Sequence, residues 1–134
     1  MGPGSLFMTL AHCYGADHVW IASIEGTDAS QVFAGLAEIR SLDALMAKWS
    51  EVDARWERFL ATVRDEDLGR PVVRVRDGVS YTTDLADILI HVCTHLMYHA
   101  AQMKNMMRHL GAKDLPMTDF IVFGRERWNA THGA

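Results

Sequence analysis

The sequence feature that most constrains the fold is a heptad pattern of apolar residues that follows Ser41. Four of them repeat every seven positions and three more are offset by three: Leu42, Trp49, Trp56 and Val63, then Leu45, Val52 and Phe59. This is the a/d spacing of a helix that buries one side along another helix. Ser41 is a suitable N-cap, and the charged run from Arg64 to Asp67, followed by Gly69 and Pro71, predicts the end of the helix. The segment therefore needs at least one partner helix.

Helical spacing of apolar residues predicts two more long helices, one on each side of this segment. The first runs from Leu6 to Ile24, with Ser5 as its N-cap and Gly26 as its stop. The other runs from Thr83 or Asp84 to about Leu110, with Gly111 at the C-terminal cap position. These two helices are the candidate partners of the heptad segment.

The remaining stretches predict shorter elements. Gly26 to Arg40 is expected to be a loop with at most a short helical turn or two. Pro71 to Arg76 and Val79 to Thr82, joined by Asp77-Gly78, have the pattern of a two-stranded hairpin. Thr118 to Trp128 could form a short final helix. The prediction is thus a mainly helical fold with one small ribbon.

Length and composition favour a single domain over residues 1–134, with Met1 to Gly4 as a flexible leader. The 49% of hydrophobic residues is ordinary globular usage, and the net charge of -4 without basic clusters argues against nucleic acid as a partner. No apolar stretch is long enough for a membrane span, and no signal-like segment occurs, so a cytoplasmic protein without a membrane partner is expected. Cys13 and Cys93 lie in helical patterns, so free buried thiols are expected, with a disulfide as the alternative.

Three of the seven histidines form a ladder on the helix predicted from Thr83 or Asp84 to about Leu110. His91, His95 and His99 follow one another at four-residue steps and therefore line one face. Two imidazoles at i and i+4 can bind one metal ion together, and the absence of Glu between them excludes the metalloprotease motif. The alternative is a set of hydrogen-bonded core histidines. A metal would need a third ligand from another helix, for which His12 and His18 are the candidates.

Three blocks of sequence, taken together, resemble the DinB/YfiT-like family. The first, Thr9 to Ile21, holds His12 followed by Asp17 and Trp20. The second, His91 to Gln102, resembles the signature H-x-x-x-H-x-x-x-H-R-G-Q. The third, from Gly111 to Phe123, resembles the closing pattern of the family through four residues: Pro116, Asp119, Ile121 and Phe123. The blocks cover most of the chain in the right order, which makes the combined match more specific than any single motif.

The resemblance implies an all-α, up-down helical bundle in which three histidines hold a divalent metal, commonly zinc or nickel. Carried over by position, the metal ligands are His12, His95 and His99. The resemblance places Gln102 and His91 beside these ligands, each with an ordinary buried or core role as the alternative. His18 does not occupy a ligand position. Asp17 and Trp20 match the family and are expected to hold the helices together.

Two departures from the family affect the prediction. Ala100-Ala101 stands where Arg-Gly is usual, which removes a cation near the site. Family members also carry one more long helix before the His12 helix, where this chain has only Met1 to Gly4. A bundle without that helix would expose an apolar face, at a cost of roughly 25 cal/mol per Å². A homodimer in which the partner fills the gap is therefore expected.

Two classes of function remain open. The resemblance favours a metal-dependent thiol transferase or hydrolase acting on a small molecule, for which a small thiol is a candidate substrate. The alternative is a non-enzymatic helical dimerisation module with structural histidines. Motifs for a serine nucleophile, a phosphate-binding loop and a dinucleotide site are absent. No residue stands out as a general base, because Asp17 and Asp87 fit capping or surface roles equally well.

Overall fold

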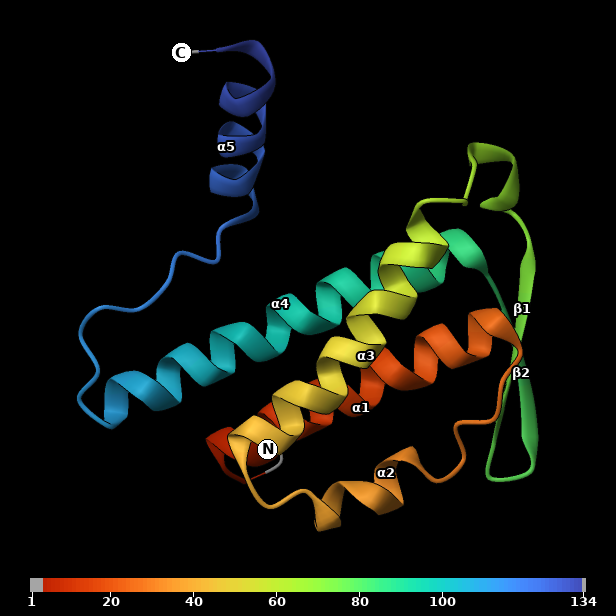
Figure 1. Ribbon diagram of the computed structural model, residues 1–134, viewed down its shortest axis with the longest axis horizontal. Coiled ribbons are helices and arrows are strands. Elements are labelled where there is room, and N and C mark those ends of the chain that lie inside the picture. The colour runs from red at the N-terminus through yellow and green to blue at the C-terminus, as the bar shows by residue number, and fades with distance from the viewer. Residues whose placement is uncertain (1–3, 134) are drawn as a thin grey trace.

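The computed structural model describes residues 4–133, so Met1 to Pro3 of the expected leader lie outside the described residues. Three long helices dominate the fold: α1 (Leu6–Glu25), α3 (Leu42–Leu60) and α4 (Leu85–His109). They run side by side, with a hairpin at one end and a final helix that projects away (Figure 1). Within residues 4–133, none of the helices combines the length and apolar character that a bilayer crossing requires. The predicted mainly helical fold is confirmed.

The central element is α1, which is buried on nearly all sides. Eleven of its twenty residues are buried, and it contacts both α3 and α4. Ser5 accepts a hydrogen bond from the backbone N–H of Met8 at 3.1 Å, and Gly26 ends the helix in the left-handed region at φ 70°. A helix that is apolar all round is stable only inside a protein, so the other elements are arranged around it.

The heptad side of α3 packs on α1, as predicted. Leu45 and Val52 are buried in one cluster with Ala11 and Ile21 of α1. Three larger side chains of α3 pack partly buried against the same cluster: Trp49, Trp56 and Phe59.

The ends of the heptad segment differ from the prediction. α3 ends at Leu60, four residues before the charged run. The Thr62 hydroxyl donates a hydrogen bond to the backbone carbonyl of Phe59 at 2.9 Å, which competes with continuation of the helix. Val63 therefore lies beyond the helix, although it still packs on a buried cluster. Leu42, in the first turn, is 51% exposed and does not take part in the seam.

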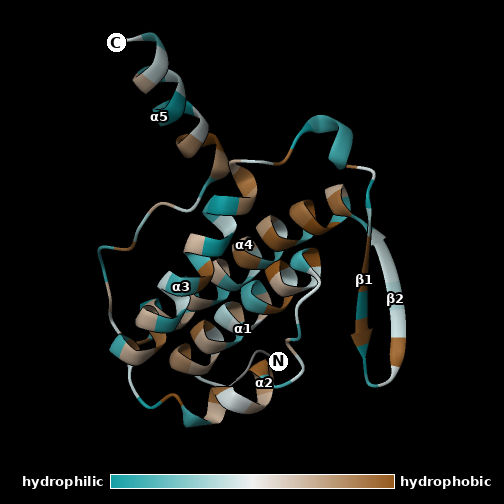
Figure 2. Cartoon of the chain, turned by 45° about the vertical axis from the view of Figure 1, so that its right-hand side comes forward, coloured by the Kyte–Doolittle hydropathy of each residue, from teal (hydrophilic) through white to brown (hydrophobic). Residues whose placement is uncertain are grey.

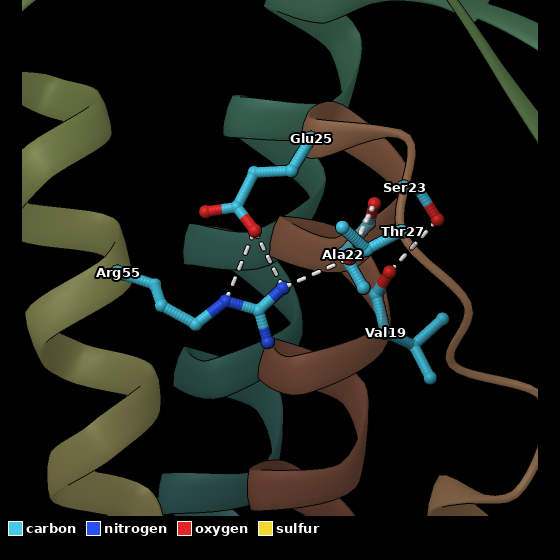
Figure 3. A network of polar contacts seen from close by, with 6 residues as sticks. All are labelled: Val19, Ala22, Ser23, Glu25, Thr27 and Arg55. Carbon is cyan, nitrogen blue, oxygen red and sulfur yellow. Dashed lines mark hydrogen bonds and ion pairs between the residues drawn. The ribbon is translucent and has the colours of Figure 1, made fainter.

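Two polar contacts tie α3 to α1. Trp49 Nε1 donates a hydrogen bond to Asp17 Oδ2 at 3.0 Å. Arg55 donates from Nε and Nη2 to Glu25 Oε2 at 3.1 and 2.6 Å, and from Nη2 to Thr27 Oγ1 at 3.1 Å (Figure 3). Arg55 thus joins the end of α1 and the loop that follows it to the middle of α3. The expected packing role of Asp17 agrees with this contact.

The hairpin closes one end of the helices. β1 (Pro71–Arg76) and β2 (Val79–Asp84) pair antiparallel, with Asp77 at φ 52° and Gly78 at φ 77° in the turn. Two successive left-handed residues are what a tight hairpin turn requires. Val72 is buried in a second cluster with residues of both neighbouring helices: Ile24, Leu85 and Ile88. The hairpin is confirmed, and because β2 continues to Asp84, α4 begins at Leu85.

The connection between α1 and α3 is the expected loop with short helical turns. It contains α2 (Val32–Gly35) and a single 3-10 turn (Leu36–Glu38); a similar turn (Asp65–Asp67) precedes the hairpin. A Cβ on Gly15 would lie 2.9 Å from Phe33 Cε1. The missing side chain at Gly15 therefore lets Phe33 come close to α1.

The final helix, α5 (Phe120–His132), begins two residues later and ends four residues later than predicted. It projects away from the other helices (Figure 1). Its first residues are hydrophobic and its middle is hydrophilic (Figure 2). Its large apolar side chains are exposed: Phe120, Ile121, Phe123 and Trp128.

Both cysteines are free, but only one is buried as predicted. Cys13 lies inside the apolar core of α1 and is 1% exposed. Cys93 is exposed. The expectation of two buried thiols is wrong for Cys93, because this residue lies on the outer side of α4.

The buried carboxyl of Asp17 predicts a characteristic pH dependence. Burial raises its pKa from 3.8 to about 6, partly offset by the hydrogen bond from Trp49. The folded state then binds more protons than the unfolded state between these two values, so the free energy of unfolding falls as pH rises from about 4 to about 6. Asp17→Asn keeps an acceptor for Trp49 and removes the charge. We expect the variant to gain about 3 kcal/mol relative to the native protein as the pH rises through that range.

Urea unfolding of metal-free protein on both sides of this pH range measures the difference. Glu57→Gln, which removes an exposed carboxylate of α3, serves as the control and should leave the pH profile unchanged. Parallel pH profiles for Asp17→Asn and the native protein would contradict the expected desolvated charge.

Candidate metal centre

Two of the ladder histidines and one histidine of α1 meet in a single cluster. Nε2 of His95 lies 3.2 Å from Nε2 of His12 and 3.2 Å from Nε2 of His99. One ligand atom from each of the three residues lies within 4.8 Å of the others, an arrangement that could hold a metal ion. The cluster joins α1 to α4 across 83 positions of the sequence.

The sequence places these rings together through the packing of α1 on α4. On α4, Ile88 is buried at one end of the inner side and His99 lies further along it, 7% exposed. His95 is one turn before His99, so both rings face the same neighbour. His12 meets them from the side of α1 that turns toward α4, and the rings of His12 and His99 are 4.8 Å apart in a T-shaped arrangement.

The spacing of the nitrogens fits a metal bound by three imidazoles. Zinc–nitrogen bonds of about 2.0–2.1 Å in a tetrahedral site separate neighbouring ligand nitrogens by about 3.3 Å. The two Nε2 separations from His95, each 3.2 Å, agree with that value. A single imidazole nitrogen has one lone pair or one proton, so Nε2 of His95 cannot donate to one neighbour while accepting from the other. A shared cation satisfies all three nitrogens at once.

The protonation state of the cluster also suits a metal. Desolvation by burial, and then the neighbouring His99, His12 and His91, lower the pKa of His95 to about 4. Burial, followed by the nearby His99, lowers the pKa of His12 as well. His12 and His95 are therefore neutral near pH 7, which is the form of imidazole that binds a metal.

Gln102 makes the contact that sets the tautomer of His99. Its Oε1 lies 2.8 Å from His99 Nδ1, one turn further along α4. A carbonyl oxygen accepts, so His99 donates from Nδ1–H and is left with a lone pair on Nε2, the nitrogen that faces His95. Gln102 thus orients a histidine of the cluster.

The other two histidines considered for the site stay outside the cluster. The ring of His91 lies 5.5 Å from the ring of His95 and 5.2 Å from that of Trp20, without a hydrogen bond to either. It lines the space beside the cluster and is exposed. His18 lies on another side of α1, where its Nδ1 is 3.3 Å from the hydroxyl of Tyr14. Of the two candidates for a third ligand, the structure brings His12 to the cluster.

The cluster opens onto a cavity of about 1190 Å³. His12, His95 and His91 form part of its lining, and Trp20 and Phe33 contribute aromatic walls. The Phe33 ring lies 5.8 Å from that of His12. β1 supplies a further wall with Arg74 and Arg76. A small molecule in this cavity would therefore reach the histidines from between the helices and the hairpin.

Arg74 and Phe33 are lining residues that the motifs do not indicate. Positions 72, 74 and 76 alternate with 73 and 75, so Arg74 shares the hairpin face of the buried Val72. A charged residue in the inward register of a strand was therefore an available signal. Phe33 lies in an irregular loop, and only its contact with Gly15 reveals its position.

Groups that could have acted as nucleophile or base lie elsewhere. Burial, with the nearby Asp17, raises the pKa of the Cys13 thiol to about 11, which makes it an unreactive core residue. The Asp17 carboxyl is held by Trp49 of α3, away from the histidines. Asp87 is exposed in the first turn of α4. The chemistry of the site therefore rests on the histidines and the cavity lining.

The model of the DinB family matches residues 2–127, nearly the whole chain. Neither the curated proteins nor the solved structures include a match to this sequence.

The contact of Gln102 with His99 predicts a shift in tautomer. Gln102→Leu removes the acceptor at Nδ1, and the loss of about 1 kcal/mol changes the tautomer ratio of His99 roughly fivefold toward Nε2–H. Gln102→Glu retains an acceptor and should retain the native tautomer. Nitrogen-15 NMR of the ring nitrogens in metal-free protein measures the ratio. An unchanged ratio in Gln102→Leu would mean that another group orients the ring.

Proposed function

The chain belongs to the DinB family, and from that premise we propose that it is a divalent-metal-binding protein that acts as a metal-dependent thiol transferase or hydrolase on a small molecule. In this proposal His12, His95 and His99 are the metal ligands, and zinc or nickel is the metal. Gln102 and His91 lie beside the ligands in supporting positions. Neutral nitrogen ligands suit both metals.

The observation that supports this proposal is the convergence of three imidazole nitrogens from two helices. Nε2 of His95 lies 3.2 Å from Nε2 of both His12 and His99, which fits a shared cation, and the Gln102 contact leaves a lone pair of His99 directed inward. With hydrogen bonds alone, Nε2 of His95 can pair fully with only one of its two neighbours, which leaves a nitrogen of a partly buried cluster without a partner. The site also opens onto a cavity large enough for a small molecule.

The protein's own residues have distinct tasks in such a reaction. A bound divalent metal supplies Lewis acidity and lowers the pKa of a bound water or thiol. His12 and His95 present the reactive position to the cavity, while His99, which is buried, is fixed by Gln102. Phe33 and Trp20 exclude water from the cavity walls and hold the apolar part of a substrate.

Metal content tests the proposal directly. We expect purified native protein to contain about one zinc or nickel per chain by elemental mass spectrometry after reconstitution, and His95→Ala and His99→Ala to lose it. Added metal should raise the melting temperature of the native protein and not that of these variants. His18→Ala, a histidine of α1 outside the cluster, is the matched control and should retain the metal.

Two results would contradict the proposed metal site. If the native protein takes up no metal, or if His95→Ala lowers stability equally with and without added metal, the histidines have a structural role. The function would then be that of a helical association module.

A specific observation also favours association, and we propose a homodimer. The outer stripe of α4 (Ile90, Cys93, Met97 and Ala101) is exposed and has the three- and four-residue spacing of a packing face. α5 of the same chain has exposed aromatic residues and projects away from the other helices (Figure 1). The chain thus supplies both halves of an apolar contact, so the outer stripe is assigned to α5 of a second copy.

The dimer predicts that charge on the outer stripe is disruptive. Met97→Glu buries a carboxylate in the contact, and we expect a loss of about 3 kcal/mol, or roughly a hundredfold in the dimer dissociation constant. Analytical ultracentrifugation measures it, with Met46→Glu on the exposed side of α3 as the control. A native protein that is monomeric at micromolar concentrations would contradict the dimer. Protection of α5 amides from exchange in that monomer would show that α5 folds back on its own copy.

A further inference from the structure

The cavity beside the histidine cluster contains a cation that lies within ion-pair distance of no carboxylate among the described residues. Arg74 of β1 is half-buried and makes no ion pair among residues 4–133. The other charged residues of the lining are already engaged. Arg76 Nε lies 3.4 Å from Asp77 Oδ2, and Asp28 accepts hydrogen bonds from the backbone N–H and hydroxyl of Ser30 at 2.8 and 3.2 Å. Arg74 is therefore available to an anion from outside the chain.

The position of Arg74 is fixed by an aromatic ring. Its guanidinium carbon lies 5.0 Å from the ring centroid of Trp20, a cation–π contact. The Arg74 side chain makes no hydrogen bond within residues 4–133, so its N–H groups remain available to a ligand. A guanidinium held this way is suited to two parallel hydrogen bonds with a carboxylate or phosphate.

Arg74 is connected to the histidine cluster by a continuous row of rings. The ring centroid of Trp20, which contacts Arg74, lies 5.2 Å from that of His91, and the ring centroids of His91 and His95 are 5.5 Å apart. Arg74, Trp20, His91 and His95 all line the same cavity of about 1190 Å³. A single small molecule in this cavity can thus contact the guanidinium at one end and the histidine cluster at the other.

The inward placement of Arg74 has a cost that packing does not explain. On its face of β1 the neighbouring Val72 is buried, and a valine or methionine at position 74 would pack there without desolvating a charge. Burial, and then the nearby Arg76, lower the pKa of Arg74, with Asp77 acting in the opposite direction, which agrees with an unfavourable setting for a cation. An anionic ligand removes this cost when it binds.

We propose that Arg74 is the anion-binding residue of the substrate cavity, so that the substrate is a small molecule with a carboxylate or phosphate at one end and its reacting group at the other. The inference deepens the proposed function, because the reacting group is the one directed at His12, His95 and His99. Ala100-Ala101 stands where Arg-Gly is usual in the family, so α4 of this chain lacks that cation near the histidines. Arg74 would supply a positive charge to the same cavity. The anion is held by the hairpin rather than by α4.

Paired probes of equal length test the anion site. With zinc-loaded protein, isothermal titration calorimetry compares mercaptohexanoate with mercaptohexanol, which has the same chain and thiol but lacks the charge. We expect the carboxylate to bind about tenfold more tightly. Added salt should reduce this preference, because the cavity is open to solvent.

Substitutions at position 74 test whether Arg74 causes the preference for the carboxylate probe. Arg74→Met keeps an apolar contact with Trp20 and should bind both probes equally. Arg74→Lys, which retains the charge without the two-pronged edge, should keep part of the preference. The control is Arg64→Met, the same substitution at a surface arginine outside the cavity, and this variant should bind both probes as the native protein does. Circular dichroism checks that each variant is folded.

A second arm separates this inference from the metal site. In metal-free protein, hexanoate but not hexanol should shift the NMR signals of the Trp20 indole and the Arg74 side chain, and Arg74→Met should abolish the Trp20 shift. If the protein holds no metal but this arm succeeds, the proposed function fails and the anion site stands. If Arg74→Met keeps the native preference for mercaptohexanoate, or hexanoate leaves Trp20 unperturbed, the anion site is overturned.

Discussion

The structure depends on one constraint, the burial of α1 on nearly every side. Apolar or small residues lie around most of its circumference, and eleven of its twenty residues are buried. Such a helix cannot lie on a surface, so neighbours must cover it from several directions. α3 and α4 cover two sides, α2 approaches over Gly15, and the hairpin covers the end near Ile24. The cavity and the histidine cluster lie where these neighbours meet.

The same constraint explains how two polar groups came to be buried on α1. His12 and Asp17 are five residues apart, which places them about 140° apart around the helix axis. Asp17 therefore turns toward α3 and His12 toward α4. Asp17 receives a hydrogen bond from Trp49, and its raised pKa reduces the charge it must bury. His12 instead meets the rings of His95 and His99, and a cation bound to all three would satisfy their nitrogens.

Sequence patterns predicted the parts of the fold that depend on local periodicity. The helix caps at Ser5 and Ser41, the Asp77-Gly78 turn and the ladder of His91, His95 and His99 are all local signals, and the structure agrees with them. His95 and His99 could be placed at one site from the sequence, because the helix itself fixes their spacing.

What the sequence could not decide depends on contacts between distant segments. The choice of His12 over His18 needed the family resemblance, since both lie on α1 and only the packing of α4 distinguishes them. The exposure of Cys93 and of Leu42 depends on which sides of their helices are covered. The contact of Arg74 with Trp20 joins a strand to a helix more than fifty positions away. Alternation along β1 indicates which face of the hairpin Arg74 occupies, but it does not indicate the contact with Trp20.

The cluster has a consequence for stability as well as for chemistry. A cation held by His12, His95 and His99 joins α1 directly to α4, and the chain between them includes α2, α3 and the hairpin. Closing a loop of this length removes entropy from the unfolded chain, so binding free energy becomes folding free energy. The outer stripe of α4 faces away from this link, since Met97 lies about 200° around the axis from both His95 and His99. The proposed metal site and the proposed dimer contact therefore lie on opposite faces of one helix and share no residue of α4.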